Sequence, residues 1–355
     1  MEPYLNTCYG SVNHQTCIAE IAASRDTKSN QGGTSSITTN TDPNLNLPKH
    51  SLFKNDNSRP RQKYKGMRKW KKFGLQGMRP EETCIIRLLS YNILAQHLIE
   101  MHRYLYKHHN EHTLEWNVRK ELLLQEILEV ICLQEMQQEH LSEFVKPFEE
   151  HGYKYLYKKR TNDKKDGLLL MYRSDTFNLV EFTNVEFFQS GIELLSRDNV
   201  AIIVKLSLKD SPQTEVVIAT THLLYNPKRN DVRLGQTQIL MQYLLTDHFQ
   251  TWPRYCPIIM AGDFNLQPYS GVYEFITRGS VYSHKDSNGQ NEATTHQDGW
   301  VTVDYIFFSD VELIEKYTLP TQRQCEALST IPNFATGSDH LSLGATFILR
   351  KKKRL

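Results

Sequence analysis

Polar side chains that can bind metals and phosphates stand at the ends of six apolar runs in this 355-residue chain. The runs are "LLSYNIL", "VICLQEM", "VIATTHLLYN", "IIMAGDFN", "VTVDYIFF" and "GSDHLSL". In the same order they carry Asn92, Gln134 with Glu135, His222 with Asn226, Asp263 with Asn265, Asp304, and Asp339 with His340. A turn explains one such segment. Six of them predict a shared site, because open α/β sheets bind ligands at the carboxyl ends of their strands.

The residue types at these ends limit the chemistry. Oxygen ligands, with Glu135 foremost and Asn92 and Asp339 beside it, suit a hard cation such as Mg²⁺, with Mn²⁺ as an alternative. The runs lack the several His or Cys ligands that zinc prefers. No Ser or Cys stands out as an activated nucleophile, which favours direct attack by water. Neutral Asn and His donors beside a divalent cation suit a phosphate ester, whose transition state gathers negative charge.

Strands and helices alternate along the part of the chain that carries these residues. Apolar runs predict strands at 84–94, 130–135, 153–159, 167–173, 200–208, 215–224, 257–261, 301–309 and 341–349. Helical spacing of apolar residues predicts helices at 114–128, 140–152 and 231–249. This alternation, with some hairpins, predicts an α/β layered sandwich with a mixed sheet. The first helix runs into the strand of Glu135 with almost no turn, so either the helix ends early or the strand is shorter.

The first 80 residues differ in composition from the rest. The segment "SRDTKSNQGGTSSITTNTDPNLNLPKH" predicts disorder, because it buries too little apolar surface to offset its ordering entropy. Residues 49–74 then carry about ten basic residues against one acid, with Tyr64, Trp70 and Phe73 interleaved. Two hypotheses fit them: an arm that contacts RNA phosphates, with Trp70 free to stack on a base, and a solubilising or targeting tail. The predicted organisation is a disordered region at 1–80, basic towards its end, a catalytic domain at 81–350 and a basic tail at 351–355.

Composition and cysteine spacing predict the environment of the protein. Hydrophobic residues make up 39% and charged residues 23%, which fits a globular protein, and the formal charge of +2 by itself says nothing about nucleic acid. The six cysteines form no close CxxC pair, which predicts free thiols in a reducing compartment. No secretory signal is visible, and no apolar stretch approaches the ~20 residues of a membrane helix. We therefore expect a cytoplasmic protein, and the tail "RKKKRL" leaves a nuclear pool open.

Seven motifs in their order along the chain resemble a known family. They are "SYNILAQ", "CLQE", "RDNVA", "THLLYNP", "GDFN", "VDYIF" and "SDH". Together they resemble the Mg²⁺-dependent phosphodiesterases of the endonuclease/exonuclease/phosphatase superfamily over roughly residues 84–350, and within it the deadenylase–Nocturnin–Angel branch. The segments "THLLYNPKRNDVRLGQ", "SVYSH" and "TVDYIFFS" look most like Angel proteins. The resemblance implies two mixed, largely antiparallel sheets flanked by helices.

The resemblance also implies a role for each matching residue. Glu135 would be the principal Mg²⁺ ligand, with Asn92 and Asp339 near the metal. Asp263 would orient or deprotonate the attacking water, and Asn265 would help to hold water and phosphate. His222 and His340 would contact the phosphate, and Asp304 would pair with His340. Whether His340 or Asp263 takes the proton stays open. Weaker candidates for substrate contact are Arg197, Asn199, Asn226 and Trp300. A salt-bridged start of a strand explains "SRDNVA" equally well.

The activity expected from this resemblance is Mg²⁺-dependent hydrolysis at RNA 3′ ends, most simply by a 3′-to-5′ exoribonuclease of poly(A)-deadenylase type. The Angel resemblance implies an alternative, an RNA 2′,3′-cyclic phosphatase, and a third hypothesis is a weakly catalytic RNA-binding adaptor in mRNA regulation. Classical deadenylases carry an adenine-stacking aromatic residue shortly before the "DY" motif, whereas Trp300 stands four residues before Asp304, which mildly favours the phosphatase. The expected partners are mRNA 3′ ends, with mRNA-decay or translation factors as further candidates and no membrane.

Overall fold

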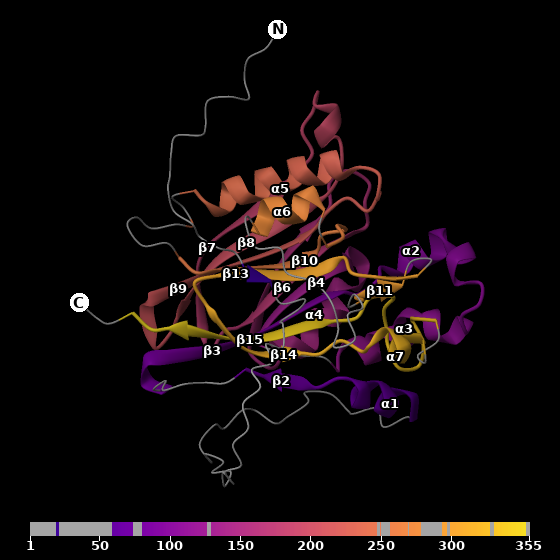
Figure 1. Ribbon diagram of the computed structural model, residues 1–355, viewed down its shortest axis with the longest axis horizontal. Helices are drawn as coiled ribbons and strands as arrows, with labels where there is room; N and C mark the ends of the chain where they lie inside the picture. Colours follow the sequence, from indigo (N-terminus) through magenta and orange to yellow (C-terminus); the bar gives the residue numbers. More distant parts are fainter. Residues whose placement is uncertain are drawn as a thin grey trace, which may run out of the picture.

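Two β-sheets pack face to face in the computed structural model, and helices cover their outer faces (Figure 1). The structure describes residues 19–20, 59–73, 80–125, 129–246, 249, 256–268, 270–277, 293–296, 299–326 and 330–352. This arrangement confirms the predicted α/β layered sandwich with two mixed, largely antiparallel sheets flanked by helices.

The first sheet has seven strands and carries the N-terminal part of the candidate site. Their order is β2 (Trp70–Lys72), β14 (Glu312–Tyr317), β15 (Leu343–Arg350), β3 (Thr83–Asn92), β4 (Val130–Gln137), β6 (Asp166–Arg173) and β5 (Tyr153–Lys159). Among these described strands only β3 and β4 pair in parallel, with Asn92 opposite Gln134. The carboxyl ends of β3 and β4 therefore lie side by side.

The second sheet has six strands and carries the C-terminal part of the site. Their order is β1 (Ala19–Glu20), β13 (Asp304–Ser309), β10 (Ile258–Asp263), β9 (Ser211–His222), β8 (Val200–Leu208) and β7 (Phe177–Glu186). The pair β9 and β10 is parallel and sets Asp263 opposite His222. Antiparallel β13 sets Asp304 opposite Asp263, so three polar residues meet at one edge.

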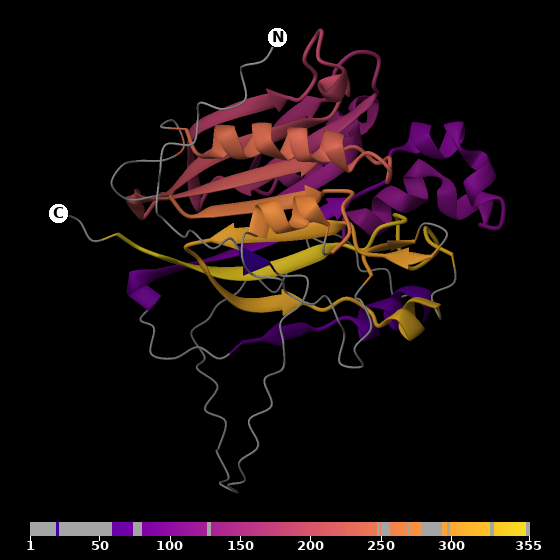
Figure 2. The same cartoon turned by 45° about the horizontal axis from the view of Figure 1, so that its top comes forward.

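Apolar side chains between the two sheets form the main core, to which every long strand contributes. The outer face of the six-stranded sheet packs under α5 (Asn230–Leu244) and α6 (Gly271–Thr277), as Figures 1 and 2 show. The outer face of the seven-stranded sheet packs under α3 (Trp116–Leu123) and α4 (Leu141–Glu149). Strands β4 and β10 are buried along their whole lengths, which explains why their sequences are continuously apolar before the polar ends.

Shorter elements complete the fold. They are α2 (Gln96–Met101), α7 (Gln322–Glu326), the two-stranded pair β11 (Thr295–His296) and β12 (Trp300–Val301), and the 3₁₀ helices η1 (Pro80–Glu82), η2 (Arg103–Tyr106), η3 (Glu111–Leu114), η4 (Gln138–His140) and η5 (Glu193–Leu195). The cysteines of the described segments, Cys84, Cys132, Cys256 and Cys325, are free thiols, as predicted. Within those same segments, no helix combines the length and the apolar character needed to cross a membrane.

The predicted disorder of residues 1–80 does not hold for residues 59–73. They form α1 (Arg59–Met67) and β2, which pairs with β14 (Figure 1). Arg61 and Arg68 are buried because distant carbonyls accept from them: Arg61 Nη1 donates to Ala335 O at 2.6 Å and Arg68 Nη2 to Ser342 O at 2.5 Å. The rest of the predicted disordered region, residues 1–18, 21–58 and 74–79, lies outside the described residues, as do residues 353–355 of the predicted tail.

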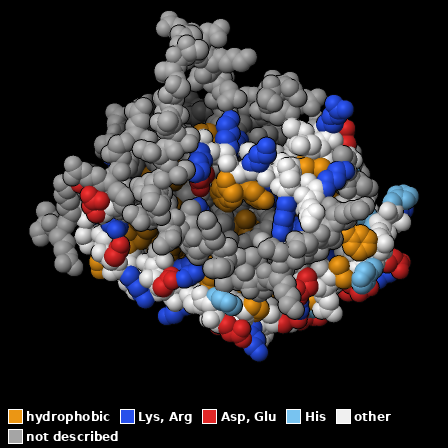
Figure 3. All heavy atoms as spheres, turned by 90° about the horizontal axis from the view of Figure 1, so that it is seen from below, with side chains coloured by type: hydrophobic (Ala, Val, Ile, Leu, Met, Phe, Trp, Pro, Cys, Tyr) orange, Lys and Arg blue, Asp and Glu red, His pale blue; other side chains and the backbone are white. Residues whose placement is uncertain are grey.

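The hypothesis that Trp70 is free to stack on a base is wrong. Its ring stacks on Tyr317 with 5.2 Å between centroids, and Arg68 lies 3.8 Å above the same Tyr317 ring. The indole is therefore part of the sheet edge. Figure 3 views the face that carries β2 and α1, where Lys and Arg side chains flank an apolar hollow near the centre.

Candidate active site

The polar residues that follow the apolar runs meet at one end of the sandwich, the end that carries α2 and β11 (Figure 2). Asn92 ends β3, Glu135 lies near the end of β4, His222 ends β9, Asp263 ends β10, Asp304 begins β13, and Asp339 and His340 precede β15. Both central pairs of strands are parallel, so chain direction brings their carboxyl ends to the same edge. The predicted shared site is thus formed by both sheets.

Asn92 joins the two sheets at the centre of the site. Its Nδ2 donates to Glu135 Oε1 at 2.9 Å and to Asp263 Oδ2 at 3.0 Å, while its Oδ1 accepts from the backbone of Leu94 at 3.1 Å. The side chain is 1% exposed. The amide nitrogen of Asn92 faces the two carboxylates, and its amide oxygen is bonded to the backbone of Leu94. In this arrangement Asn92 orients Glu135 and Asp263, and its oxygen is not free to act as a metal ligand beside them.

Glu135 occupies an irregular position in β4. The ladder between β4 and β6 shifts register between Leu133 and Met136, and Glu135 has a φ of 62°. This bulge re-aims the carboxylate, as bulges beside active sites commonly do. Glu135 Oε2 accepts from the backbone of Ala95 at 3.0 Å. Burial, followed by the charges of Asp166 and Asp339, raises the pKa of Glu135 above its ordinary value.

The segment before Glu135 shows how the missing turn is accommodated. Helix α3 ends at Leu123, five residues before the predicted end at 128, and β4 starts at Val130. Residues 126–128 lie outside the described part of the chain. The early end of the helix leaves Glu135 in contact with Asn92.

Asp263 lies between two histidines and is 2% exposed. His222 Nε2 is 3.5 Å and His340 Nε2 is 3.7 Å from Asp263 Oδ2. Asp263 Oδ1 accepts from the backbone of Asn265 at 3.0 Å. Burial is the main cause that raises the pKa of Asp263 to about 6, with Asp304 adding to it and the two histidines opposing it. A buried carboxylate with this pKa is suited to take a proton near neutral pH.

The two histidines differ in charge because their partners differ. His340 Nδ1 lies 2.8 Å from Asp304 Oδ2. Burial alone would lower the pKa of His340, but the hydrogen bond and charge of Asp304 outweigh it and hold that pKa well above the ordinary value. Burial lowers the pKa of His222, whose Nδ1 has no hydrogen-bond partner among the described residues. A cationic His340 and a neutral His222 therefore flank Asp263.

A divalent cation fits beside Glu135 better than beside His340. One oxygen or nitrogen from each of Asp263, Asp304 and His340 lies within 4.8 Å of the others. His340 is held protonated by Asp304, however, and a protonated imidazole has no lone pair for a metal. Around Glu135, burial and the charges of Asp166 and Asp339 disfavour the ionised carboxylate, and a bound cation would offset this electrostatic cost. The donors there are carboxylate oxygens, which suit Mg²⁺ or Mn²⁺.

The weaker substrate candidates have other contacts. Asn199 Nδ2 donates to His222 O at 2.9 Å and its Oδ1 accepts from Gln236 at 3.0 Å, so Asn199 positions the strand end that carries His222. Arg197 hydrogen-bonds only to its neighbour Ser196 within the described structure. Asn226 is exposed and accepts from the backbone of Lys228.

Trp300 packs on His296 and on a small apolar cluster, and no described contact joins its ring to the catalytic side chains. Its ring meets His296 edge to face at 5.2 Å between centroids, and it packs against the small apolar cluster that contains Tyr64 and Cys325. Asn265, by contrast, is held at the site with a φ of 51°, and its Nδ2 donates to Leu223 O at 3.0 Å.

Two residues that lie at the site were not identified from the sequence. Asp166 begins β6, is 1% exposed, and is the charge that raises the pKa of Glu135 most after burial. Asp166 could have been found by the rule that identified the other site residues, since it is a polar residue at one end of an apolar run. Arg119 is completely buried in α3, where its guanidinium donates to Ile93 O at 2.9 Å and to Gly337 O at 3.0 Å. An arginine on a helix gives no sequence signal that it will bind carbonyls in two loops.

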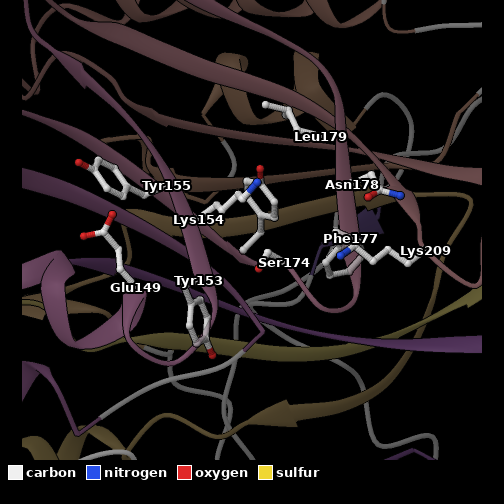
Figure 4. A pocket seen from close by; sticks show the side chains of 10 residues that line it. Glu149, Tyr153, Lys154, Tyr155, Ser174, Phe177, Asn178, Leu179 and Lys209 are labelled. Carbon is white, nitrogen blue, oxygen red and sulfur yellow. The ribbon is translucent and has the colours of Figure 1, made fainter.

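A separate pocket lies near the edge strands β5 and β7 and contains none of the site residues (Figure 4). It is lined by Glu149, Tyr153, Lys154, Tyr155, Tyr172, Ser174, Phe177, Asn178, Leu179 and Lys209.

Residues 89–340 match the endonuclease/exonuclease/phosphatase family. The chain is 37% identical to protein angel of Drosophila melanogaster over 309 residues, which cover 79% of this chain and 86% of the fly protein. It is 39% identical to protein angel homolog 2 of Bos taurus over 201 residues, which cover 55% of this chain and only 37% of the bovine protein.

Two solved structures share the fold over most of their length. ANGEL2, described as a 2′,3′-cyclic phosphatase and solved in complex with adenosine-2′,3′-vanadate, aligns with a TM-score of 0.73 and 32% identity, covering 79% of this chain and 98% of that chain. The human Nocturnin catalytic domain with a bound sulfate anion aligns with a TM-score of 0.59 and 25% identity, covering 79% of this chain and 96% of that chain.

Proposed function

Because this chain belongs to the endonuclease/exonuclease/phosphatase family, and within it to the Angel proteins, we propose that it hydrolyses 2′,3′-cyclic phosphates at RNA 3′ ends. The family membership agrees with the resemblance of the seven motifs and makes the chain a phosphoester hydrolase. The observation that carries the finer proposal is the likeness to ANGEL2, which is described as a 2′,3′-cyclic phosphatase.

The residues around Asp263 supply the groups that such a hydrolysis needs. Glu135 and Asp339 would hold a divalent cation, which supplies positive charge beside the phosphate oxygens when it is bound. Asp263, whose pKa is raised to about 6, accepts a proton from the water that attacks phosphorus. Asn265, whose Nδ2 donates to Leu223 O, would hold that water.

The histidines stabilise the charge that develops on phosphate. His340 is held as a cation by Asp304, so it donates a charge-assisted hydrogen bond to a phosphate oxygen. His222 is neutral, and Asn199 fixes the backbone from which its ring projects. Complete removal of the cyclic phosphate consumes two water molecules. It breaks the bonds from phosphorus to the ribose 2′ and 3′ oxygens, leaves both as hydroxyls and releases inorganic phosphate.

The position of Trp300 supports the phosphatase over a poly(A)-specific nuclease. The classical deadenylases that the motifs resemble carry an aromatic ring that stacks on adenine, and the Trp300 ring packs instead against His296 and the Tyr64 cluster. We therefore expect little preference for poly(A). The 3′-to-5′ exoribonuclease and the RNA-binding adaptor remain predictions that the same experiment tests.

The experiment compares two end-labelled RNAs of one sequence, incubated with purified full-length protein and Mg²⁺. One RNA has a poly(A) tail with a 3′-hydroxyl, and the other ends in a 2′,3′-cyclic phosphate. Loss of only the cyclic phosphate, absent from the Glu135→Gln control, is the expected result. A shortening ladder on the poly(A) RNA would establish the nuclease instead, and no reaction on either RNA together with binding of both would favour the adaptor.

A further inference from the structure

Arg160 stands beside the candidate site, one strand beyond its carboxylates, and the hydrolysis described above does not use it. In the seven-stranded sheet, β4 carries Glu135, its neighbour β6 begins at Asp166, and β5 ends just before Arg160. The backbone of Arg160 donates to Asp166 O at 3.0 Å, and Arg160 Nη1 lies 3.3 Å from Asp166 Oδ2. Its Nε is buried and has no hydrogen-bond partner among the described residues.

The guanidinium of Arg160 pairs with the buried carboxylate of Asp166 and is largely shielded from solvent. Its side chain is only 20% exposed. After burial, which lowers the pKa of His222 most, the charge of Arg160 lowers it further, so the guanidinium and the His222 ring lie within electrostatic reach. Asp166, the partner of Arg160, is in turn one of the charges that raise the pKa of Glu135.

Hydrogen bonds to Asp198 fix the chain that directly follows Arg160. Thr161 Oγ1 and Asn162 Nδ2 donate to Asp198 Oδ1 at 2.7 and 2.5 Å. Asp198 directly precedes Asn199, which holds the backbone of His222. The Arg160 loop and the His222 strand end are therefore tied to the same short segment, and their separation is set by the fold.

We propose that Arg160 is a substrate-binding residue that donates its Nε–H and an Nη–H to the terminal phosphate of the RNA 3′ end. A guanidinium presents these two donors in a planar fork that matches two phosphate oxygens. A phosphate that gains access to this fork would give Nε a hydrogen-bond partner, while Nη1 keeps its bond to Asp166. This inference rests on the proposed function and specifies which group recognises the phosphate end. It also moves the expected arginine contact from Arg197, whose hydrogen bonds within the described residues go to Ser196, to Arg160.

The test measures binding, so that it is independent of turnover. The full-length Glu135→Gln protein serves as the parent, and its affinity without added metal is measured by fluorescence anisotropy for one labelled RNA ending in a 3′-phosphate or in a 3′-hydroxyl. Arg160→Met should weaken binding of the phosphate-ended RNA roughly 10- to 100-fold and leave the hydroxyl-ended RNA unchanged, because only the phosphate uses the fork. Arg160→Lys keeps the charge without the fork, so its affinity for the phosphate-ended RNA should lie between those of the parent and Arg160→Met.

Lys158→Met is the matched control, since it removes one positive charge from β5, the strand that ends just before Arg160. The Lys158 ammonium pairs with Glu186 and is 21% exposed, so its loss should affect both RNAs equally. An unchanged preference for phosphate in Arg160→Met, or no preference in the parent, would overturn the inference. If Arg160→Met has a lowered melting temperature, Arg160→Lys decides: full parental preference in that folded variant refutes the fork.

The binding test also separates this inference from the proposed reaction. Loss of the phosphate preference in Arg160→Met, together with wild-type protein that removes no cyclic phosphate, would reject the reaction and support the phosphate contact. Wild-type turnover with an unchanged preference in Arg160→Met would support the reaction and leave Arg160 as a structural partner of Asp166.

Discussion

Gly262 lies where strands β9 and β10 approach closely, next to the catalytic groups. A Cβ atom at this position would lie 2.0 Å from Thr221 O, at a φ of +156°. Real Cβ contacts essentially never fall below 3.0 Å, so Gly262→Ala must move the two strands apart by at least 1.0 Å or rotate the Thr221 peptide. The residues that follow are His222 and Asp263, which face each other across this pair of strands.

The expected effect follows from the size of this displacement. Overpacking a buried site costs roughly 1–3 kcal/mol, and for a domain of this size that lowers the melting temperature by roughly 2–10 °C. A misplacement of about 1 Å at reacting groups costs on the order of 10²-fold in rate. Gly262→Ala should therefore lose far more activity than stability. Gly271→Ala is the control, because no atom lies within 4 Å of a Cβ there and the position begins α6.

The assay pairs thermal unfolding with kcat on an RNA ending in a 2′,3′-cyclic phosphate. We expect Gly262→Ala to melt a few degrees lower and to react on the order of 10²-fold more slowly, with Gly271→Ala equal to wild type. A Gly262→Ala protein with wild-type kcat and melting temperature would show that the strand separation does not position Asp263 and His222.

Four further predictions test the site and its supports. Glu135→Gln should abolish Mg²⁺-stimulated turnover, because it removes the buried charge at the expected metal position; titrating Mg²⁺ against rate checks this. Asp304→Asn should slow turnover on the order of 10²-fold at pH 7, since it removes the charge that keeps His340 protonated, and an unchanged rate would contradict that role. Arg119→Met should lower the free energy of unfolding by roughly 3 kcal/mol or more in a urea titration, because three acceptors around the site lose their donor. Deleting residues 1–58, which carry four Lys or Arg against five Asp or Glu, should leave RNA affinity at low salt and kcat unchanged, and a weaker affinity would assign that segment a role in RNA binding.

The sequence predicted much of the site because local patterns decide which residues end a strand. Buried strands require apolar residues along their length, and the first polar residue marks the point where the chain reaches an edge. Asn92, Asp263 and Asp304 were found in this way, and all three lie at the shared edge. Each parallel pair of strands has a predicted helix between its two strands in the sequence, α3 between β3 and β4 and α5 between β9 and β10.

The sequence did not predict the roles of residues that depend on a partner far away in the chain. Arg61 and Arg68 lie in a strongly basic segment, which by composition alone predicts a solvated arm. Their acceptors, Ala335 O and Ser342 O, lie more than 270 residues away in the chain, so only the closed sheet makes burial favourable. Arg119 and Arg160 are the same case, since each guanidinium is explained by groups from other elements.

The sequence by itself therefore determined the layered fold, the family and the chemical types gathered at one edge. The tertiary structure decided their use: which amide atom of Asn92 faces the carboxylates, which histidine carries the charge, and that Asp166 and Arg160 stand beside them. The physical reason is that strand ends are set by short-range burial patterns. Hydrogen-bond partners and pKa values depend instead on atoms a few ångströms away in space that the chain supplies from far along its length.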